Sequence, residues 1–234
     1  MIFAAGLGTR FKPWTDTHPK ALAVINGKSL LQRNIEYLQE YGIRKVVVNV
    51  HHFADQVRKS VEENKGWGSE ITFSDETNEL LETGGGLKKA LPLFTTSTIV
   101  VINSDILTDL DLGKMIDAHR SWGALATLAV SERNTSRYFL FNEKNMLCGW
   151  RNTTTGEEKI SRKASVYIQK AFSGIHVLQV DLIKKIVREG KFSMVDVYLD
   201  LAATENILAF DHTGSKFIDV GKPEAVAQAA SMFP

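Results

Sequence analysis

Short apolar runs separated by amphipathic stretches make up the first 130 residues of the chain. The runs are bounded by turn residues and predict buried strands at Met1–Ala5, Lys45–Val50, Glu70–Ser74, Thr98–Ile102 and Ala124–Val130. The stretches between them repeat apolar residues at helical spacing, with faces at Leu31, Ile35 and Leu38, at Phe53, Val57 and Val61, and at Leu112, Met115, Ile116 and His119. Because parallel strands need crossover helices, this alternation predicts an α/β fold with a doubly wound, mostly parallel sheet.

From Tyr138 onward the pattern changes. Runs separated by Asn, Gly, Thr and Lys turns predict a smaller antiparallel region, with strands at Tyr138–Phe141, Met146–Trp150 and Val166–Leu178. Helical spacing returns later and predicts helices at Asp181–Arg188, Val195–Thr204 and Pro223–Met232. Two further strands are predicted at Ile207–Phe210 and Phe217–Val220. The chain has no repeat or linker, so we expect one domain over residues 1–234, built from lobes at residues 1–135 and 136–234.

Composition and charge limit the classes of ligand. The 234-residue chain has a formal net charge of +1, so it lacks a global basic field for a nucleic-acid backbone. Its one cysteine, Cys148, excludes an internal disulfide and a zinc site made of several cysteines. No apolar run approaches the ~18 residues of a membrane span, and the apolar N-terminus is too short for a signal peptide. We therefore expect a cytoplasmic protein that binds neither nucleic acid nor membrane.

A glycine-rich loop, Ala5–Arg10, follows the first predicted strand. Gly6 and Gly8 allow a tight turn and close approach of a phosphate to backbone N–H groups. A dinucleotide-binding loop needs a third glycine where Phe11 stands, which argues against a nicotinamide-dependent dehydrogenase, and the Walker pattern is absent. The loop therefore indicates a phosphate cradle of another kind, with a tight turn that binds no ligand as the alternative.

Two cations flank this loop. Arg10 ends it, and Lys20 follows Pro19 ten residues later. Arginine offers a planar fork to phosphate oxygens, and lysine offers a compact point charge. Together they suit a triphosphate that is attacked at its α-phosphorus, although either one can also be a solvated surface charge.

Two aspartates follow or end predicted strands. Asp105 comes after the apolar run Thr98–Ile102, and Asp219 stands between apolar neighbours in Phe217–Gly221. A carboxylate at the end of a buried strand is costly unless a cation meets it, and Mg²⁺ is bound by one or two carboxylates together with phosphates. We therefore predict Asp105 and Asp219 as Mg²⁺ ligands. A turn cap at Asp105, or pairing of Asp219 with Lys216 or Lys222, is the alternative.

A second glycine cluster, Glu82-Thr83-Gly84-Gly85-Gly86, precedes a helix predicted from Gly86 to Leu91. Three consecutive glycines are entropically costly, so they indicate close approach by a flat ligand or a phosphate. A nucleotide base or ribose fits this requirement. A flexible turn is the alternative.

With these residues in view, the chain resembles the sugar-1-phosphate nucleotidylyltransferases, which make NDP-sugars. Their opening signature reads roughly A-[AG]-G-x-G-[ST]-R-[LMF]-x-P-x-T and is followed by P-K. Here the sequence is Ala4-Ala5-Gly6-Leu7-Gly8-Thr9-Arg10-Phe11-Lys12-Pro13-Trp14-Thr15, followed by Pro19-Lys20. Asp105 matches the family's metal-binding aspartate after a central strand, Asp219 matches the second one in a [WF]-x-D-[VI]-G segment, and Phe172–Ile175 resembles the strand whose glycine backbone faces the sugar.

The resemblance implies a role for each group of residues. Arg10 and Lys20 would be catalytic, and Asp105 and Asp219 would hold the Mg²⁺ cofactor. The nucleotide would be bound by residues of both glycine clusters, Ala4, Ala5, Gly6, Leu7, Gly8, Thr9, Arg10, Glu82, Thr83 and Gly84. The sugar would be bound by Asn103, Gly174 and Asp196. Residues 1–135 would then form the nucleotide-binding lobe, and residues 136–234 the sugar-binding and completing lobe.

The implied reaction is in-line attack of a sugar-1-phosphate on the α-phosphate of an NTP, with release of pyrophosphate. The short chain and residues 82–86 look most like N-acetylmuramate-1-phosphate uridylyltransferases, which implies UTP and an amino-sugar-1-phosphate. Guanylyltransferases that use mannose-1-phosphate and cytidylyltransferases that use phosphocholine are the alternatives, as is a non-catalytic nucleotide-sugar sensor. We expect a monomer or small homo-oligomer.

The sequence departs from the family pattern at several places. Asn103-Ser104-Asp105 stands where many members have Gly-Asp, and Ala21 replaces a common proline. The Glu-Lys-Pro triplet that often handles the sugar phosphate is not found, and residues 149–152 lie in roughly that region. The missing triplet leaves the sugar open, whereas the reaction class does not depend on these positions.

Overall fold

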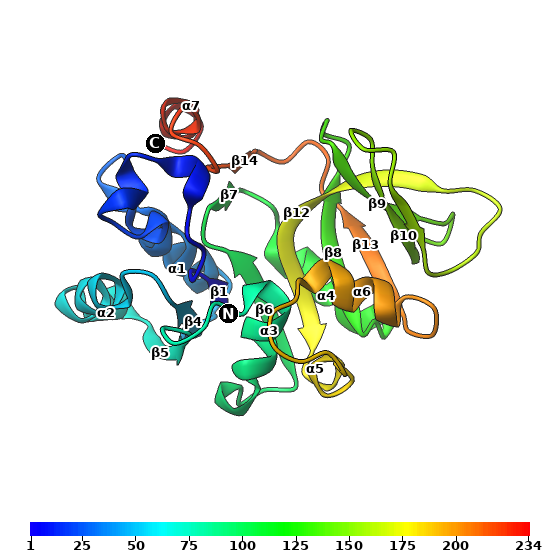
Figure 1. Ribbon diagram of the computed structural model, residues 1–234, viewed down its shortest axis with the longest axis horizontal. Helices are drawn as coiled ribbons and strands as arrows, with labels where there is room; N and C mark the ends of the chain where they lie inside the picture. The colour runs from blue at the N-terminus through cyan, green and yellow to red at the C-terminus, as the bar shows by residue number, and fades with distance from the viewer.

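A mixed, twisted sheet forms the centre of the protein, which a computed structural model describes over residues 1–234 (Figure 1). Its parallel part runs in the order β5-β4-β1-β6, and these strands span Glu70–Asp75, Lys45–Val50, Ile2–Phe3 and Thr98–Asn103. Strand β12 (Ile168–Gln179) then pairs antiparallel with β6 and with β8 (Ala126–Ser131), and β13 (Ile207–Asp211) pairs parallel with β8. The predicted α/β class and mostly parallel sheet are confirmed.

Helices cover both faces of this sheet, as the term doubly wound requires. The helices α1 (Leu30–Glu40), α2 (Ala54–Glu63) and α4 (Leu112–Trp122) pack on one face, and α3 (Glu82–Lys89), α5 (Asp181–Lys184) and α6 (Met194–Leu201) pack on the other. The strands alternate accordingly, because Ile2 and Val48 face the first group of helices whereas Phe3 and Val47 face the second. No helix is long and apolar enough to cross a membrane.

A smaller antiparallel region lies beside the main sheet. It consists of β9 (Arg137–Phe141), β10 (Leu147–Asn152) and β11 (Glu158–Ile160), and the first residues of β12 pair with β9. The antiparallel region predicted from Tyr138 onward is therefore present. Strand β12 joins it to the main sheet, because its later residues pair with β6 and β8.

Two short ribbons and a C-terminal helix complete the fold. Strands β2 (Val24–Ile25) and β3 (Lys28–Ser29) form one ribbon, and β7 (Ile106–Thr108) and β14 (Phe217–Asp219) form the other. Helix α7 (Ala225–Met232) follows β14 and contacts β2, and in Figure 1 it lies at the top, beside the blue segment that follows β1. Because β14 returns to β7, the end of the chain lies against residues that follow the central strand β6.

Three local predictions need correction. The run Ala124–Val130 is a strand as expected, but β12 lies between it and β6, so β8 does not extend the parallel group directly. The helix predicted over Asp181–Arg188 ends at Lys184. The helix expected to follow the second glycine cluster begins at Glu82 and contains all three glycines.

Candidate active site

The glycine loop begins where β1 ends, at the carboxyl edge of the parallel strands. The Ala4 N–H donates to Asn49 Oδ1 at 2.7 Å, which ties the start of the loop to β4. Gly8 has a φ of 59°, and a Cβ placed there would lie 2.8 Å from Thr15 Cγ2 and 3.1 Å from Lys20 Cβ. Glycine is therefore required at this position both by the backbone conformation and by the close approach of the following segment.

Lys20 and Asp105 meet in the site although they are far apart in sequence. The Lys20 side chain is only 10% exposed, and its Nζ donates to Asp105 Oδ2 at 2.5 Å. The ammonium group also lies 5.8 Å from the ring centroid of Phe11, which is buried. Burial of the lysine thus depends on a carboxylate partner and an aromatic face.

Asp105 and Asp219 are brought together by the β7–β14 ribbon. Asp219 pairs with Ile106 in the ribbon, and the Val220 N–H donates to the Asp105 carbonyl oxygen at 2.8 Å. Desolvation and the negative charge of Asp105 raise the pKa of the Asp219 carboxyl, whereas the charges of Lys20 and Arg10 oppose this shift. Neither Lys216 nor Lys222 forms an ion pair with Asp219, so the alternative of simple lysine pairing is not realised.

This pair of carboxylates fits a divalent cation. Two carboxylates in one site repel each other until a cation compensates them, and this repulsion adds to burial in raising the pKa of Asp219. No group of three or more His, Cys, Asp or Glu side chains is arranged for a metal ion. Two aspartates suit Mg²⁺, which is usually held by one or two carboxylates while substrate phosphates and water complete its coordination.

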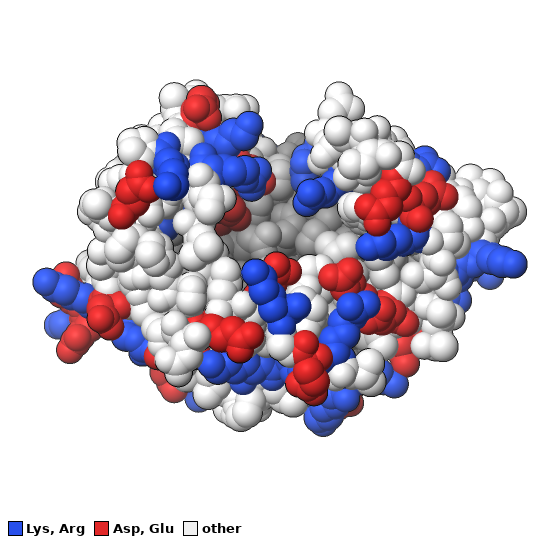
Figure 2. All heavy atoms as spheres, viewed as in Figure 1, with Lys and Arg blue, Asp and Glu red and all other residues white.

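A cavity of about 320 Å³ collects most of the predicted nucleotide-binding and catalytic residues. The predicted residues that line it are Ala4, Gly6, Gly8, Thr9, Arg10, Lys20, Thr83, Asn103 and Asp105. An adjoining cavity of about 330 Å³ is lined by Asp219 and Lys222, and Arg10 and Gly221 border both cavities. Figure 2 shows the molecule hollowed between its two halves, with basic side chains on both sides of the hollow.

The second glycine cluster serves packing within the protein. A Cβ at Gly84 would lie 2.5 Å from the Phe192 ring, and one at Gly85 would lie 2.3 Å from the Gly190 carbonyl oxygen. The chain itself therefore makes a close approach at these glycines, and their predicted contact with a nucleotide stays a prediction. Of this cluster only Thr83 lines the glycine-loop cavity, and Glu82 lies 3.7 Å from Lys191 at the surface.

The three predicted sugar-binding residues fall in two places. Gly174 has a φ of 72° at an irregularity in β12, and a Cβ there would lie 2.7 Å from Asn103 Nδ2, so these two residues are in contact. Asp196 instead completes the capping box of α6, because its Oδ2 accepts hydrogen bonds from the backbone N–H and the Oγ of the N-cap residue Ser193. The structure therefore unites Asn103 with Gly174, while Asp196 has a structural partner already.

Comparison with known proteins identifies the family. The nucleotidyl transferase family description matches residues 1–233. The chain belongs to this family. Its relatives include the N-acetylmuramate alpha-1-phosphate uridylyltransferase of Caulobacter vibrioides, which is 32% identical over 234 residues that cover 96% of this chain and 92% of the relative. The D-glycero-alpha-D-manno-heptose 1-phosphate guanylyltransferase of Campylobacter jejuni is 31% identical over 231 residues, which cover 96% of this chain and 95% of the relative.

Solved structures agree with this assignment. HddC from Yersinia pseudotuberculosis complexed with GMP-PN has a TM-score of 0.80 and 28% identity, and the match covers 100% of this chain and 98% of that one. Some relatives are longer, and the chain spans 60% of the UTP–glucose-1-phosphate uridylyltransferase of Synechocystis sp.. The predicted family, a sugar-1-phosphate nucleotidylyltransferase, is thereby confirmed, and the chain is an enzyme of this class.

One support of the nucleotidyl transferase site escaped the sequence analysis. Asn49 accepts from the Ala4 N–H and donates to Glu76 Oε1 at 2.7 Å, and Glu76 Oε2 accepts from the Leu81 N–H at 3.1 Å. Glu76 is fully buried, and burial raises the pKa of its carboxyl. This chain of bonds links the glycine loop to the start of α3. The signal in the sequence was a single asparagine inside the β-branched run Lys45–Val50.

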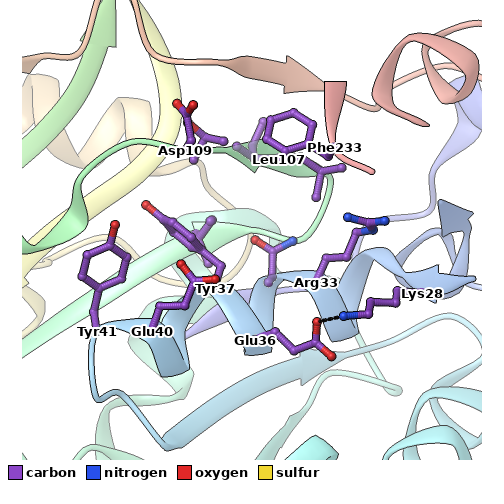
Figure 3. Close-up of a pocket in the computed structure, with 13 residues that line it drawn as sticks. Lys28, Arg33, Glu36, Tyr37, Glu40, Tyr41, Leu107, Asp109 and Phe233 are labelled. Atoms are coloured by element: carbon purple, nitrogen blue, oxygen red, sulfur yellow. Dashed lines mark hydrogen bonds and ion pairs between the residues drawn. The ribbon is translucent and has the colours of Figure 1, made fainter. Parts of the chain in front are cut away.

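A third cavity, of about 350 Å³, lies between α1, β7 and Phe233 (Figure 3). Tyr37 and Tyr41 extend from α1 toward the segment that carries Asp109, and both hydroxyl groups donate to the Leu110 carbonyl oxygen. Asn34 is buried in its wall and donates to the Ser104 carbonyl oxygen at 3.0 Å. This side of α1 therefore supports the segment that presents Asp105.

Proposed function

We propose that the protein transfers a nucleotidyl group from an NTP to a sugar-1-phosphate and releases pyrophosphate. The observation that carries this proposal is the meeting of Lys20, Asp105 and Asp219 beside the glycine loop. A reaction between two phosphates needs positive charge and fixed geometry more than it needs an acid or a base, because the attacking phosphate oxygen is already anionic. The site supplies positive charge from Arg10 and Lys20 and fixed geometry from the glycine loop.

Each part of the site has a role in this proposal. The loop from Gly6 to Thr9 binds phosphate through backbone N–H groups, and Arg10 and Lys20 stabilise charge on the α-phosphate and on the leaving pyrophosphate. Asp105 and Asp219 would hold Mg²⁺, which neutralises phosphate charge when bound. Asn103, Gly174 and Asp196 remain our candidates for the sugar, and the contact between Asn103 and Gly174 supports the first two of them.

UTP and an amino-sugar-1-phosphate such as N-acetylmuramate-1-phosphate are the substrates that we favour. The full-length similarity to the Caulobacter uridylyltransferase supports this choice. GTP with a heptose or mannose 1-phosphate is the second candidate, because the Campylobacter guanylyltransferase is similar over nearly its whole length and HddC was crystallised with GMP-PN. Either pair is consistent with a cytoplasmic reaction and with the predicted division into a nucleotide lobe and a sugar lobe.

The test is a matrix of nucleotides and acceptors. Purified protein, Mg²⁺, each of UTP, GTP, CTP and ATP, and a panel of sugar-1-phosphates are combined, and pyrophosphate release is followed. We expect one pair to be turned over far faster than the others and Asp105→Asn to remove that activity. Absence of release with every pair, together with nucleotide binding that persists in EDTA, would instead identify a non-catalytic sensor.

A further inference from the structure

Arg133 lies at the same edge of the sheet as the glycine loop and Asp105. It follows β8, which runs parallel to β6 because both strands pair antiparallel with β12. The carboxyl ends of parallel strands meet at one edge, and ligands of open α/β sheets bind there. Arg10 and Lys20 belong to the N-terminal segment that follows β1, so Arg133 approaches this edge from another part of the molecule.

Two contacts hold the Arg133 guanidinium in place. Its Nη2 donates to the Phe172 carbonyl oxygen at 2.7 Å, and its Cζ lies 5.0 Å from the ring centroid of Phe217. Phe172 is two residues before Gly174, and Phe217 is two residues before Asp219. Burial lowers the pKa of Arg133, and the negative charge of Asp219 opposes this shift. Arg133 lines a cavity of about 330 Å³ together with Phe217 and His212. The guanidinium is thus anchored to the two strands that carry the predicted sugar-facing glycine and the second metal ligand.

The charge of Asp219 acts on Arg133, but no carboxylate of the protein forms an ion pair with its guanidinium. Its neighbour Glu132 pairs with Lys170 at 2.7 Å, and Lys170 also binds Asp211 at 2.8 Å. Arg133 forms no ion pair, and its buried Nε has no hydrogen-bond partner. A partly buried cation with an unused donor is costly unless a ligand compensates it. Glu132 and Asp211 instead neutralise Lys170, so the Arg133 guanidinium can still bind an anionic ligand.

An acceptor phosphate needs such a cation. Arg10 and Lys20 border the glycine-loop cavity, where the NTP would bind, and Lys20 is already paired with Asp105. The incoming phosphate monoester is itself an anion and must approach another anion. An arginine fork matches the geometry of phosphate oxygens better than a single ammonium group does.

We propose that Arg133 binds the phosphate group of the acceptor and thereby restricts acceptors to phosphate monoesters. This inference rests on the proposed function, because it assigns a residue to the second substrate of the same site. The nucleotide is held by the opposite side of the site, so Arg133 contributes little to NTP binding. Its role is to position the attacking phosphate.

The experiment compares wild type with Arg133→Gln, Arg133→Lys and a matched control, Arg44→Gln. Arg44 is exposed before β4, at the opposite edge of the sheet, and the only hydrogen bond of its side chain is one of 3.4 Å to the Gly68 carbonyl oxygen. The KM for the sugar-1-phosphate is measured at saturating NTP, and the KM for the NTP is measured at saturating sugar-1-phosphate. For Arg133→Gln we expect the acceptor KM to rise roughly 10- to 100-fold and the NTP KM to change less than about twofold.

The lysine variant separates charge from geometry. Arg133→Lys keeps the charge but loses the fork, so its acceptor KM should lie between those of wild type and Arg133→Gln. Arg44→Gln should match wild type in both KM values. The inference is overturned if either Arg133 variant leaves the acceptor KM unchanged, or raises both KM values equally. Failure of the proposed function would be seen separately, as absence of turnover by the wild-type enzyme.

Discussion

The Lys20–Asp105 pair shows how one contact can serve both structure and chemistry. The ammonium group has few water molecules around it, because its side chain is only 10% exposed. In such surroundings a positive charge acts more strongly on nearby phosphates than it would in water. The carboxylate that holds Lys20 is also one of the two candidate metal ligands. A change at either residue therefore alters the charge of the site and the position of its partner.

Replacing Lys20 tests this directly. Lys20→Gln should lower kcat by roughly 10²- to 10³-fold, because it removes one of the two cations that border the glycine-loop cavity. Lys12→Gln is the matched control, since Lys12 is 64% exposed and pairs only with the exposed Asp16, and its activity should be near that of wild type. Initial rates at saturating substrate and thermal midpoints would be compared. Equal kcat values for the two variants would show that Lys20 takes no part in the reaction.

At this scale, residues in a distinctive pattern were predictable and isolated ones were not. Asp105 and Asp219 were predicted because a carboxylate after an apolar strand has a cost that a cation removes, and the ribbon does bring them together. Arg133 gave no such signal, because a lone arginine after a strand is usually a solvated charge. Its importance follows from Phe172 and Phe217, which are distant in sequence and meet it only in the folded chain.

At the scale of elements, the glycines of α3 lead to an unusual prediction. Gly86→Ala in a helix would ordinarily stabilise a protein by about 0.5–1 kcal/mol. Here the new Cβ would lie 2.5 Å from Glu76 Oε1 and 3.0 Å from Asn49 Nδ2, and both side chains are buried and bonded to each other. We expect a loss of roughly 1–3 kcal/mol in the free energy of unfolding, measured by urea denaturation.

Gly113→Ala is the control for this prediction. Gly113 also lies inside a helix, α4, but a Cβ there would have its nearest neighbour, Asp111 Oδ1, at 3.3 Å. This variant should be neutral or slightly more stable than wild type. If both alanine variants gain stability, the packing of α3 against Glu76 is looser than the structure indicates. Because Asn49 also holds Ala4, a loss of activity in Gly86→Ala would show that this contact reaches the glycine loop.

The order of strands could be predicted only in part. Apolar periodicity identifies β4, β6 and β8 as strands, but it carries no information on which strands are neighbours. Alternation of strands and helices favoured a continuous parallel group, whereas β12, from the second half of the chain, is inserted between β6 and β8. The strand β7 was missed because three residues, Ile106–Thr108, are too short for a pattern. That ribbon is nevertheless what joins the two aspartates.

At the scale of the whole molecule, buried histidines make stability depend on pH. His176 is a residue of β12 that is 1% exposed, and its Nδ1 is hydrogen-bonded to the hydroxyl of Tyr198 on α6. Burial lowers the pKa of His176 to about 3. Burial likewise lowers the pKa of His119 to about 4. In the unfolded chain both imidazoles bind a proton below about pH 6.5, whereas in the folded protein they stay neutral until a lower pH.

The free energy of unfolding should therefore keep the full contribution of these histidines above about pH 6.5 and should fall as the pH drops toward 4. Each histidine contributes a slope of roughly 1.4 kcal/mol per pH unit in that interval. His176→Asn should be less stable at neutral pH, because it loses aromatic packing, but its slope between pH 6 and 4.5 should be smaller by about one proton. Urea denaturation at several pH values measures both quantities. An unchanged slope would mean that His176 is protonated in the folded protein.

Binding of substrate across the hollow should stabilise the molecule as a whole. A ligand that binds only the folded state adds about 2.7 kcal/mol at a hundredfold excess over its Kd, which for a chain of this length raises Tm by roughly 5–10 °C. We expect that rise for the preferred NTP with Mg²⁺ and a smaller one for the NTP in EDTA, because the phosphates would then face Asp105 and Asp219 without a cation between them. Asp219→Asn should reduce the difference between the two conditions, since it removes one metal ligand and part of the repulsion. The same Tm with Mg²⁺ and with EDTA in the wild type would show that the two aspartates bind no metal with the nucleotide, and the pair would then act only to position Lys20.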